Sequence, residues 1–509
     1  MRRAAGQITV FLALSSVLIF ALILSCLEGS RSACIEALLQ QGTDSSIRSV
    51  FAAYQGEVRR EYGLLLCQGK DLGTLSWPDE AKTYAEKYLQ PGAGTLFDEA
   101  DRIRAATVSV TALDSVFITE GQGRIFADEV ADYMSSAGLS ILLQELLGRL
   151  GLYSEEDGFG LIESLRGMLG EGNGLENVLG GYKDIKKQAA DLQKQAKENE
   201  KPGSGTASPA PAVSAGEMKA DLLEQIKAIK DNGLIAVITG SESLSEYPWQ
   251  DWTLPSRLSS DAKNRHLEYP SQTISLLKHF LMGEFLFRRM GSYTDPKDSG
   301  SRYEAEYVLT GKSTDKAAFE TVVLELVLIR TGLNLAYLAT DGTKLARAEA
   351  VAAAIMSVLA LPQLILVLKW LLVTAWAVAE SIVDVRMLIK GKKVPLFKSE
   401  ASWNLTALSL DLSAEGDGRR GLSYEDYLRL LFYIGRGEDQ AYRMMDVIQK
   451  RIQQKKPLFR MSEYMVCAAV AVEVTAPYLY ITNRLPGLPG GSSGGRKYRK
   501  TAVYGYGRR

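Results

Sequence analysis

The chain has 509 residues, which is room for about two to four domains of ordinary size. Its 59 Lys and Arg side chains balance 60 Asp and Glu, so the formal net charge of −1 gives no support to a nucleic-acid-binding function. Only two histidines and four cysteines occur, and none of the cysteines has CxxC spacing, which argues against zinc sites and disulfide scaffolds. Composition alone thus indicates no obvious enzyme. Together with the motifs and the resemblance described below, it leads us to expect no catalytic residues, no metal, no cofactor and no nucleic-acid partner, in a protein that is not an enzyme.

The N-terminal segment has the composition of a membrane-spanning helix. Residues 8–27 carry no charge, follow Arg2 and Arg3, and precede Glu28. A helix of this length rises about 30 Å, the thickness of the hydrocarbon core of a bilayer. The positive-inside rule then predicts a single-pass cell-membrane protein, with residues 1–7 in the cytoplasm and the bulk of the chain outside. The anchor residues are Ile8, Phe11, Leu14, Leu18, Phe20, Leu24 and Leu27.

Two other interpretations of this segment fit less well. A cleavable signal peptide needs a shorter apolar core and a small-x-small site, which residues 29–33 do not provide. A lipoprotein cysteine at Cys26 would follow the bulky Leu24, which fits that motif poorly. We therefore expect the helix to be retained.

Residues 28–195 have the pattern of a helix-rich, membrane-proximal region that contains one or more strands. The sequence at 42–45 (GTDS) indicates a break, residues 107–118 are rich in β-branched side chains and predict a strand, and residues 125–150 predict a helix. A helical stripe follows the break and either packs on its own domain or meets a partner helix. The stripe consists of Ile47, Phe51, Tyr54, Val58, Tyr62 and Leu65.

A charged helix is predicted at residues 184–200, and a flexible linker rich in Pro, Ala, Ser and Gly at residues 196–216. Residues 217–485 then mix helices and strands without regular βαβ alternation, which predicts an α+β class with mainly antiparallel strands. The predicted strands are Tyr303–Thr310, Ala401–Leu412 and Met465–Val474, and the predicted helices are 220–232, 315–337, 424–434 and 442–454.

Two segments allow more than one interpretation. Within the hydrophobic helices predicted at residues 346–390, Pro362 divides an apolar stretch that forms either a buried helical pair or a second membrane span at residues 351–368. Residues 486–509 form a basic, Gly-rich tail. The tail is a solvated segment, a contact for anionic lipid or cell-wall polymer, or an added edge strand.

Short motifs give little support to catalysis. The GKST sequence at residues 311–314 has Glu306 where a phosphate-binding loop needs its first glycine, and the SxxK sequence at Ser275 lacks its companion motifs. Paired carboxylates can act as general acid and base, but here they lie beside basic residues on one predicted helix. We interpret Glu380, Asp384, Arg386 and Lys390 as candidates for a structural ion-pair cluster.

Four sequence blocks carry a family resemblance. They are residues 2–14 (RRAAGQITVFLAL) continued by 27–31 (LEGSR), Tyr54 with 60–65 (REYGLL), 306–312 (EYVLTGK) and 380–386 (ESIVDVR). They resemble an uncharacterised family of Gram-positive bacterial proteins related to TadE and TadG, the pseudopilin-like components of tight-adherence (Flp-type) pilus systems. Type IV prepilins have a glutamate five residues after the cleavage glycine, whereas counting from Gly6 gives Phe11 here.

The resemblance implies a membrane-anchored cell-surface protein, tied to pilus assembly or secretion and without catalysis. Its expected partners are the lipid bilayer and, through helices, other pilus or pseudopilin proteins. A second interpretation is an extracytoplasmic ligand-binding or sensory module in which Trp249 and Trp252 line a pocket. A third is a cell-wall hydrolase that uses Glu380 and Asp384.

Overall fold

The computed structural model describes residues 2–70, 77–89, 107–135, 233–240, 243–266, 276–297, 303–358, 364–405, 418–435, 437–478 and 495–506. The chain forms two compact units: unit 1 is Met1–Tyr133, Thr253–Thr273 and Ile448–Arg509, and unit 2 is Met134–Trp252 and Ile274–Val447. Helices and an antiparallel sheet confirm the predicted α+β class. The predicted segments that lie outside the described residues are the helices at 184–200 and 220–232 and the linker at 196–216.

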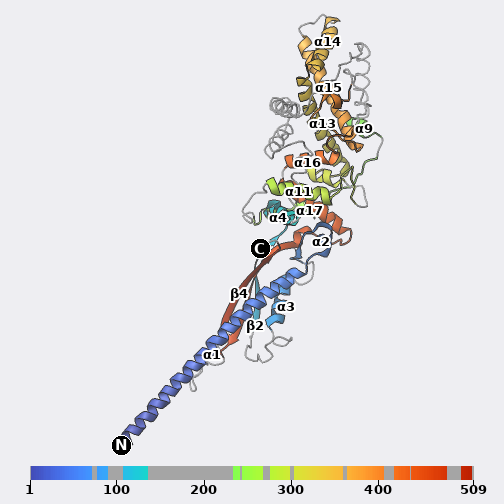
Figure 1. The fold of residues 1–509 in the computed structure, drawn as a ribbon. Coiled ribbons are helices and arrows are strands. Elements are labelled where there is room, and N and C mark those ends of the chain that lie inside the picture. Colours follow the sequence, from blue (N-terminus) through green and yellow to red (C-terminus); the bar gives the residue numbers. More distant parts are fainter. Residues whose placement is uncertain are drawn as a thin grey trace. The chain divides into compact units, whose positions relative to one another are not determined.

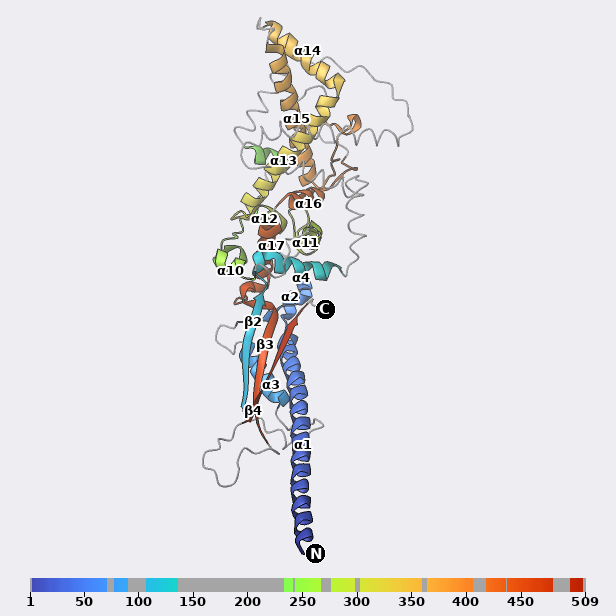
Figure 2. The same cartoon turned by 90° about the vertical axis from the view of Figure 1, so that its left-hand side faces the viewer.

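Unit 1 is built around α1 (Arg2–Ala52), one unbroken helix of 51 residues. At 1.5 Å per residue it is about 77 Å long, more than twice the thickness of a hydrocarbon core. Its side chains are mostly exposed between residues 9 and 27, whereas from Glu28 onwards a helical stripe of side chains is buried. Figure 1 and Figure 2 show the N-terminal half of α1 extending past the sheet that packs on its C-terminal half.

The break predicted at residues 42–45 is wrong, because α1 continues through this polar stretch. Its side chains bond to the helix backbone, and it packs against a neighbouring helix. The Thr43 hydroxyl donates to the carbonyl of Leu39 (2.6 Å), one turn back along the helix. A Cβ at Gly42 would lie 2.9 Å from the side chain of Leu89. The glycine therefore allows the close approach of a neighbouring helix and does not end α1.

The stripe predicted over residues 47–65 is divided between two helices. α1 ends at Ala52, and α2 (Gly56–Tyr62) begins after a turn. Val58 and Tyr62 are buried within unit 1, as is the part of the stripe on α1. The structure thus supports packing of this stripe on its own domain.

The sheet of unit 1 is antiparallel, and β3 pairs with each of the other described strands. The strands are β1 (Cys67–Gln68), β2 (Thr107–Phe117), β3 (Tyr464–Pro477) and β4 (Gly495–Gly505). β2 and β3 confirm the strands predicted at residues 107–118 and 465–474. β4 confirms the edge-strand interpretation of the basic tail for residues 495–505, so the interpretation of these residues as a disordered tail is wrong.

One face of the sheet packs against α1 and α3 (Trp77–Leu89). Apolar side chains of the second half of α1 supply the contact, and burial of each large one stabilises unit 1 by about 2 kcal/mol. Near the anchor, the core consists of Ile35, Leu39, Ala85, Val472, Val474, Ala476 and Tyr498. Farther along α1, it includes Ile47, Val50, Phe51, Trp77, Met465, Val470 and Ala502.

The other described helices complete the two units. Unit 1 also contains α10 (Ser260–Asn264), while α4 (Arg124–Ser135) and α17 (Gly437–Gln453) each cross the boundary between the units. The helices of unit 2 are α9 (Leu234–Thr239), α11 (Leu276–Arg289), α12 (Glu304–Thr310), α13 (Asp315–Thr340), α14 (Gly342–Val358), α15 (Ile365–Ile389) and α16 (Tyr424–Ile434). The helices predicted at 315–337, 424–434 and 442–454 are confirmed, as is the start of that predicted at 125–150.

The strand predicted at Tyr303–Thr310 is wrong, because this segment forms α12. Its alternating pattern places Glu304 and Glu306 at the exposed positions of a strand, but both are buried. The backbone N–H of Gly291 donates to Glu304 (2.8 Å), and that of Tyr293 donates to Glu306 (2.9 Å). The two carboxylates thus satisfy backbone donors of the preceding loop inside unit 2.

The strand predicted at Ala401–Leu412 is also wrong at its start, where a 3-10 turn, η4 (Glu400–Ser402), forms. The backbone N–H of Ser399 donates to the Ser402 hydroxyl (2.8 Å) and closes this turn. Residues 406–412 lie outside the described part of the chain.

The hydrophobic stretch is the helical pair that the sequence predicts, because α14 ends at Val358 and α15 begins at Ile365. The two helices pack against each other (Figure 2), and Lys369 of α15 forms an ion pair with Glu349 of α14 (2.7 Å). Among the described residues, the apolar stretch is thus divided between α14 and α15.

In the described part of the chain, three helices are long and apolar enough to cross a membrane: α1, α13 and α15. They differ in how much of the apolar window the protein itself buries, which is none in α1, 72% in α13 and 44% in α15. α13 and α15 also pack on each other. Of the three, the apolar segment of α1 is therefore the one whose side chains most need to be covered by a partner or by an apolar environment.

Candidate functional sites in the anchor helix and a buried ion-pair network

The structure exposes the predicted anchor. Phe11 and Leu18 are more than 70% exposed, which is unusual for large apolar side chains. The side chain of Ile8 lies outside the described part, and the remaining anchor side chains are exposed as well: Leu14, Phe20, Leu24 and Leu27. Because α1 is unbroken, whatever holds residues 9–27 also orients unit 1.

β4 lies along α1 immediately beyond the anchor. The hydroxyls of Ser32 and Tyr498 lie 2.7 Å apart, and Arg496 Nη1 donates to the Ser32 hydroxyl (2.9 Å). At the far end of the strand, the rings of Tyr504 and Phe51 meet edge to face, with centroids 5.2 Å apart. β4 therefore runs beside α1 from the anchor to the end of the helix.

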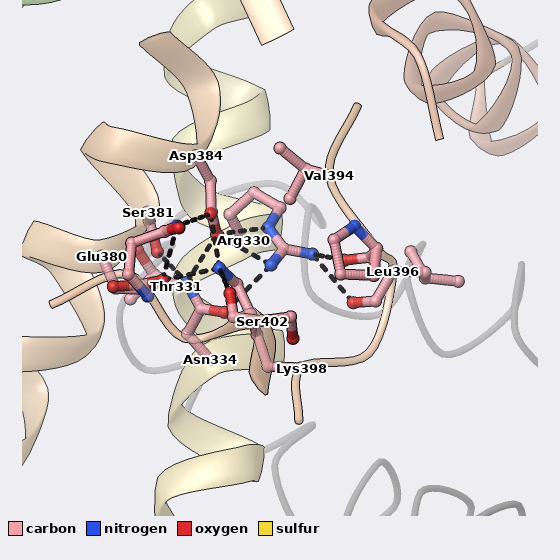
Figure 3. A network of polar contacts seen from close by, with 12 residues as sticks. Arg330, Thr331, Asn334, Glu380, Ser381, Asp384, Val394, Leu396, Lys398 and Ser402 are labelled. Atoms are coloured by element: carbon pink, nitrogen blue, oxygen red, sulfur yellow. Dashed lines mark hydrogen bonds and ion pairs between the residues drawn. The ribbon is translucent and has the colours of Figure 1, made fainter. Parts of the chain in front are cut away.

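A second group of polar residues lies inside unit 2, where α13 and α15 pack together. Glu380 and Asp384 of α15 meet Arg330 of α13 and Lys398 of the segment after α15 (Figure 3). All four side chains are at most 4% exposed. Two carboxylates face two cations, so the four groups together are electrically neutral.

Arg330 joins three parts of unit 2. Its Nε and Nη2 both donate to Asp384 Oδ2, at 3.0 and 2.8 Å. Its Nη1 donates to the carbonyls of Pro395 (3.0 Å) and Leu396 (2.8 Å), after the end of α15. Nη2 also donates to Asn334 Oδ1 (3.0 Å), one turn farther along α13.

Lys398 bridges the two carboxylates. Its Nζ lies 2.5 Å from Glu380 Oε1 and 2.7 Å from Asp384 Oδ1. Glu380 also accepts hydrogen bonds from the backbone N–H of Leu405 (2.9 Å) and from the backbone and side-chain N–H groups of Asn404 (2.8 and 2.9 Å). Both carboxylates are thus fully engaged within the protein.

This bonding pattern gives the network a structural role. Removing a charge from water is costly, and a buried ion pair offsets that cost only when its geometry is good and its remaining donors and acceptors are satisfied. Here these conditions are met, so the network fixes the position of α15 against α13 and adds little net stability. Loss of one partner would leave an uncompensated buried charge.

The helical spacing identifies the two carboxylates but not their partners. It suggests Arg386 and Lys390 as the cations of the cluster, whereas the structure pairs the carboxylates with Lys398 and Arg330. Arg330 carries a signal in the sequence, because it is the lone charge within residues 326–340. Lys398 carries none, because helical spacing does not apply beyond the end of α15.

The geometry does not favour the hydrolase interpretation. A general acid or base must come within hydrogen-bond reach of its substrate. Glu380 and Asp384 are fully buried, and their oxygens bond to groups of the protein itself. Neither carboxylate is therefore presented to a wall polymer.

The two tryptophans do not line a common pocket. Trp249 is buried, stacks on Tyr307 with ring centroids 4.1 Å apart, and donates from Nε1 to Asp315 (2.7 Å). Trp252 is 92% exposed. Trp249 is thus part of the core of unit 2.

Glu306, the residue that rules out a phosphate-binding loop before the GKST sequence at residues 311–314, is fully buried in unit 2. Its Oε1 accepts hydrogen bonds from the backbone N–H of Tyr293 (2.9 Å) and the hydroxyl of Tyr424 (3.0 Å). Its Oε2 has no hydrogen-bond partner among the described residues. Burial raises the pKa of Glu306 to about 7, because desolvation of the charged form outweighs the two hydrogen bonds.

Comparison with known proteins identifies the family of the chain but no function. The sequence profile of a family of unknown function, DUF5702, matches residues 212–476, slightly more than half of the chain. Neither the curated proteins nor the solved structures give a significant match. The matched residues include the whole buried network of unit 2 and all but the last residue of β3 in unit 1. The chain belongs to the DUF5702 family.

Proposed function

We propose that this protein is a non-enzymatic, membrane-anchored cell-surface protein that serves as a pseudopilin-like structural or assembly component of a tight-adherence pilus or secretion system. Residues 8–27 hold it in the cell membrane, with residues 1–7 in the cytoplasm and both units outside. Helices of other pilus proteins contact the same span.

The main observation behind the proposal is that α1 is one continuous helix whose two halves have different surroundings. Its residues 9–27 are apolar and uncovered, while its second half forms part of the core of unit 1. Because the helix has no break at the boundary, the anchor is continuous with the helical turns that pack on the sheet. A protein that must be held in a fixed orientation within an assembly needs such a connection, whereas a flexible tether would suffice for retention alone.

The anchor also has a surface suited to partner helices. Ala21, Ser25 and Gly29 recur every four residues, and small residues allow helices to approach closely in lipid. A Cβ added at Gly29 would have no atom within 4 Å. The stripe formed by these three residues is therefore open to another helix.

The non-enzymatic part of the proposal is supported by the paired carboxylates. Glu380 and Asp384 are the leading catalytic candidates in the sequence, and both are buried in a neutral, hydrogen-bonded network. Their environment suits structural groups better than groups that exchange protons with a substrate.

Membrane fractionation and affinity purification test the proposal. We expect the tagged full chain to remain with membranes after a high-salt wash and to co-purify with products of a pilus locus. Ser25→Ile should retain membrane association and reduce co-purification, because it places a bulky side chain in the small-residue stripe. Ser16→Ile is the matched control, because Ser16 lies on the opposite side of α1. A chain that stays in the soluble fraction, or that purifies without any pilus protein, would refute the proposal.

A further inference from the structure

We propose that the membrane-proximal end of β4 binds the headgroups of anionic phospholipids. Four residues form this surface, which we call the basic end: Arg496, Lys497, Arg499 and Lys500. The inference rests on the proposed insertion of α1 in a membrane. It goes further by assigning a second, electrostatic contact between unit 1 and the bilayer.

Contacts within unit 1 determine how far the basic end lies beyond the end of the anchor, measured along α1. Arg496 donates to the Ser32 hydroxyl (2.9 Å), and Tyr498 lies within 2.7 Å of the same group. Ser32 is five residues beyond Leu27, which corresponds to about 7.5 Å along the helix. The polar headgroup layer extends about 5–8 Å beyond each side of the hydrocarbon core. Arg496 and the adjacent Lys497 therefore lie at headgroup height.

The charges of the basic end are incompletely neutralised. Arg496 and Lys500 face α1 and lie 3.6 and 3.7 Å from the carboxylate of Glu36. On the opposite, exposed face, Arg499 lies 3.4 Å from Glu473. Within the described part of the chain, four cations thus meet two acids, which leaves two positive charges beside the bilayer. Anionic headgroups attract such charges over about one Debye length, roughly 10 Å.

The distribution of charge along β4 favours lipid over a wall polymer. Residues 496–500 contain all four cations, whereas residues 501–505 contain no charge. The uncharged half lies beside the end of α1, where Tyr504 contacts Phe51. A long polyanion could bind charges anywhere along the strand, whereas a membrane surface reaches only the end beside the anchor.

Lysine footprinting of the full chain in lipid nanodiscs tests the inference. Nanodiscs of phosphatidylcholine alone are compared with nanodiscs that also contain phosphatidylglycerol, and acetylation is read by mass spectrometry. We expect Lys497 to react about fivefold more slowly with the anionic lipid, a difference that high salt removes. Lys455 should react equally in both, because it lies beyond α1 and pairs with Glu61. Equal rates at Lys497 in the two nanodiscs would overturn the inference.

Further measurements distinguish lipid binding from polymer binding and from a failure of the anchor. Protection of Lys497 by a soluble wall polyanion, with no effect of phosphatidylglycerol, would assign the surface to polymer and overturn the lipid assignment. Failure of the chain to enter nanodiscs would refute the anchor itself, whereas entry without protection would refute only the basic end. In mixed nanodiscs, Lys497→Gln with Arg499→Gln should reduce the phosphatidylglycerol retained with the protein, while Lys455→Gln should not.

Discussion

Ser32 of α1 and Tyr498 of β4 share a hydrogen bond of 2.7 Å between their hydroxyls, although 466 residues separate them. Tyr498 belongs to the core in which Ile35 and Leu39 meet the sheet, and Ser32 is buried as well. A strand from the end of the described chain thus packs on the first helix just outside the anchor. The attachment of α1 to unit 1 therefore depends on both ends of the sequence.

Substitutions at Tyr498 should separate its hydrogen bond from its packing. Tyr498→Phe removes only the hydroxyl, so we expect the free energy of unfolding to fall by about 1 kcal/mol. Tyr498→Ala also empties the space of the ring, which should cost about 3–5 kcal/mol. Both losses are measured by chemical denaturation of the full chain, with a signal that reports the unfolding of unit 1. If Tyr498→Ala proved as stable as the wild type, the contact between α1 and β4 would not hold unit 1 together.

Local sequence patterns predict much of the fold. The uncharged run at residues 8–27, the β-branched strands at 107–118 and 465–474, and the helix at 424–434 depend on periodicity and composition, which act over short distances. Patterns of this kind indicate whether a segment is buried or exposed, but they do not identify the residues that surround it. They therefore indicate the elements but not the pairing of β4 with β3.

The errors arise where tertiary contacts override local preference. Gly42 suggests a helix end, but it provides room for Leu89. Glu304 and Glu306 suggest the exposed side of a strand, but both are buried acceptors. Lys398 cannot be assigned to Asp384 from the sequence, because that contact depends on the path of the chain after α15. In each case the decisive partner lies outside the local pattern.

Breaking the buried network should be costly. Arg330→Met leaves the charge of Asp384 without its main partner, so we expect a loss of about 3–5 kcal/mol in the free energy of unfolding. Glu349→Gln is the control, because Glu349 is exposed and its ion pair with Lys369 should be worth less than about 1 kcal/mol. Equal small losses for the two variants, measured by urea denaturation, would contradict a structural role for the network.

Two glycines with positive φ distinguish backbone strain from a steric clash. Gly391 has φ 76°, and a Cβ added there would have no atom within 4 Å, so Gly391→Ala should cost only the strain, about 1 kcal/mol. At Gly421 (φ 118°) a Cβ would lie 2.3 Å from the backbone of Val394 and Pro395. Gly421→Ala should therefore cost more than about 3 kcal/mol. Thermal unfolding of the pair checks this order, and a Gly391→Ala variant that is the less stable of the two would reverse it.

Glu306 should make the stability of unit 2 depend on pH. Its pKa is about 7 in the folded protein and about 4.5 when exposed, so the folded state holds the proton more tightly. The resulting stabilisation is fully present below pH 4.5 and is lost as the pH rises through 7, by at most about 3 kcal/mol. Glu306→Gln should remove this contribution, and Glu400→Gln, at an exposed site, should not. Parallel stability–pH curves for wild type and Glu306→Gln would show that Glu306 does not titrate in this way.

The native cysteines allow the topology to be tested without new labels. Cys26 lies within the span, whereas Cys34 is exposed on α1 and lies about 10 Å beyond Leu27. Cys67 and Cys467 are buried, and burial raises the pKa of Cys67 to about 12, so neither should react. We expect a membrane-impermeant maleimide to label intact cells at Cys34, and Cys34→Ser to abolish the label. Labelling that required permeabilised cells would place unit 1 in the cytoplasm and reverse the proposed orientation.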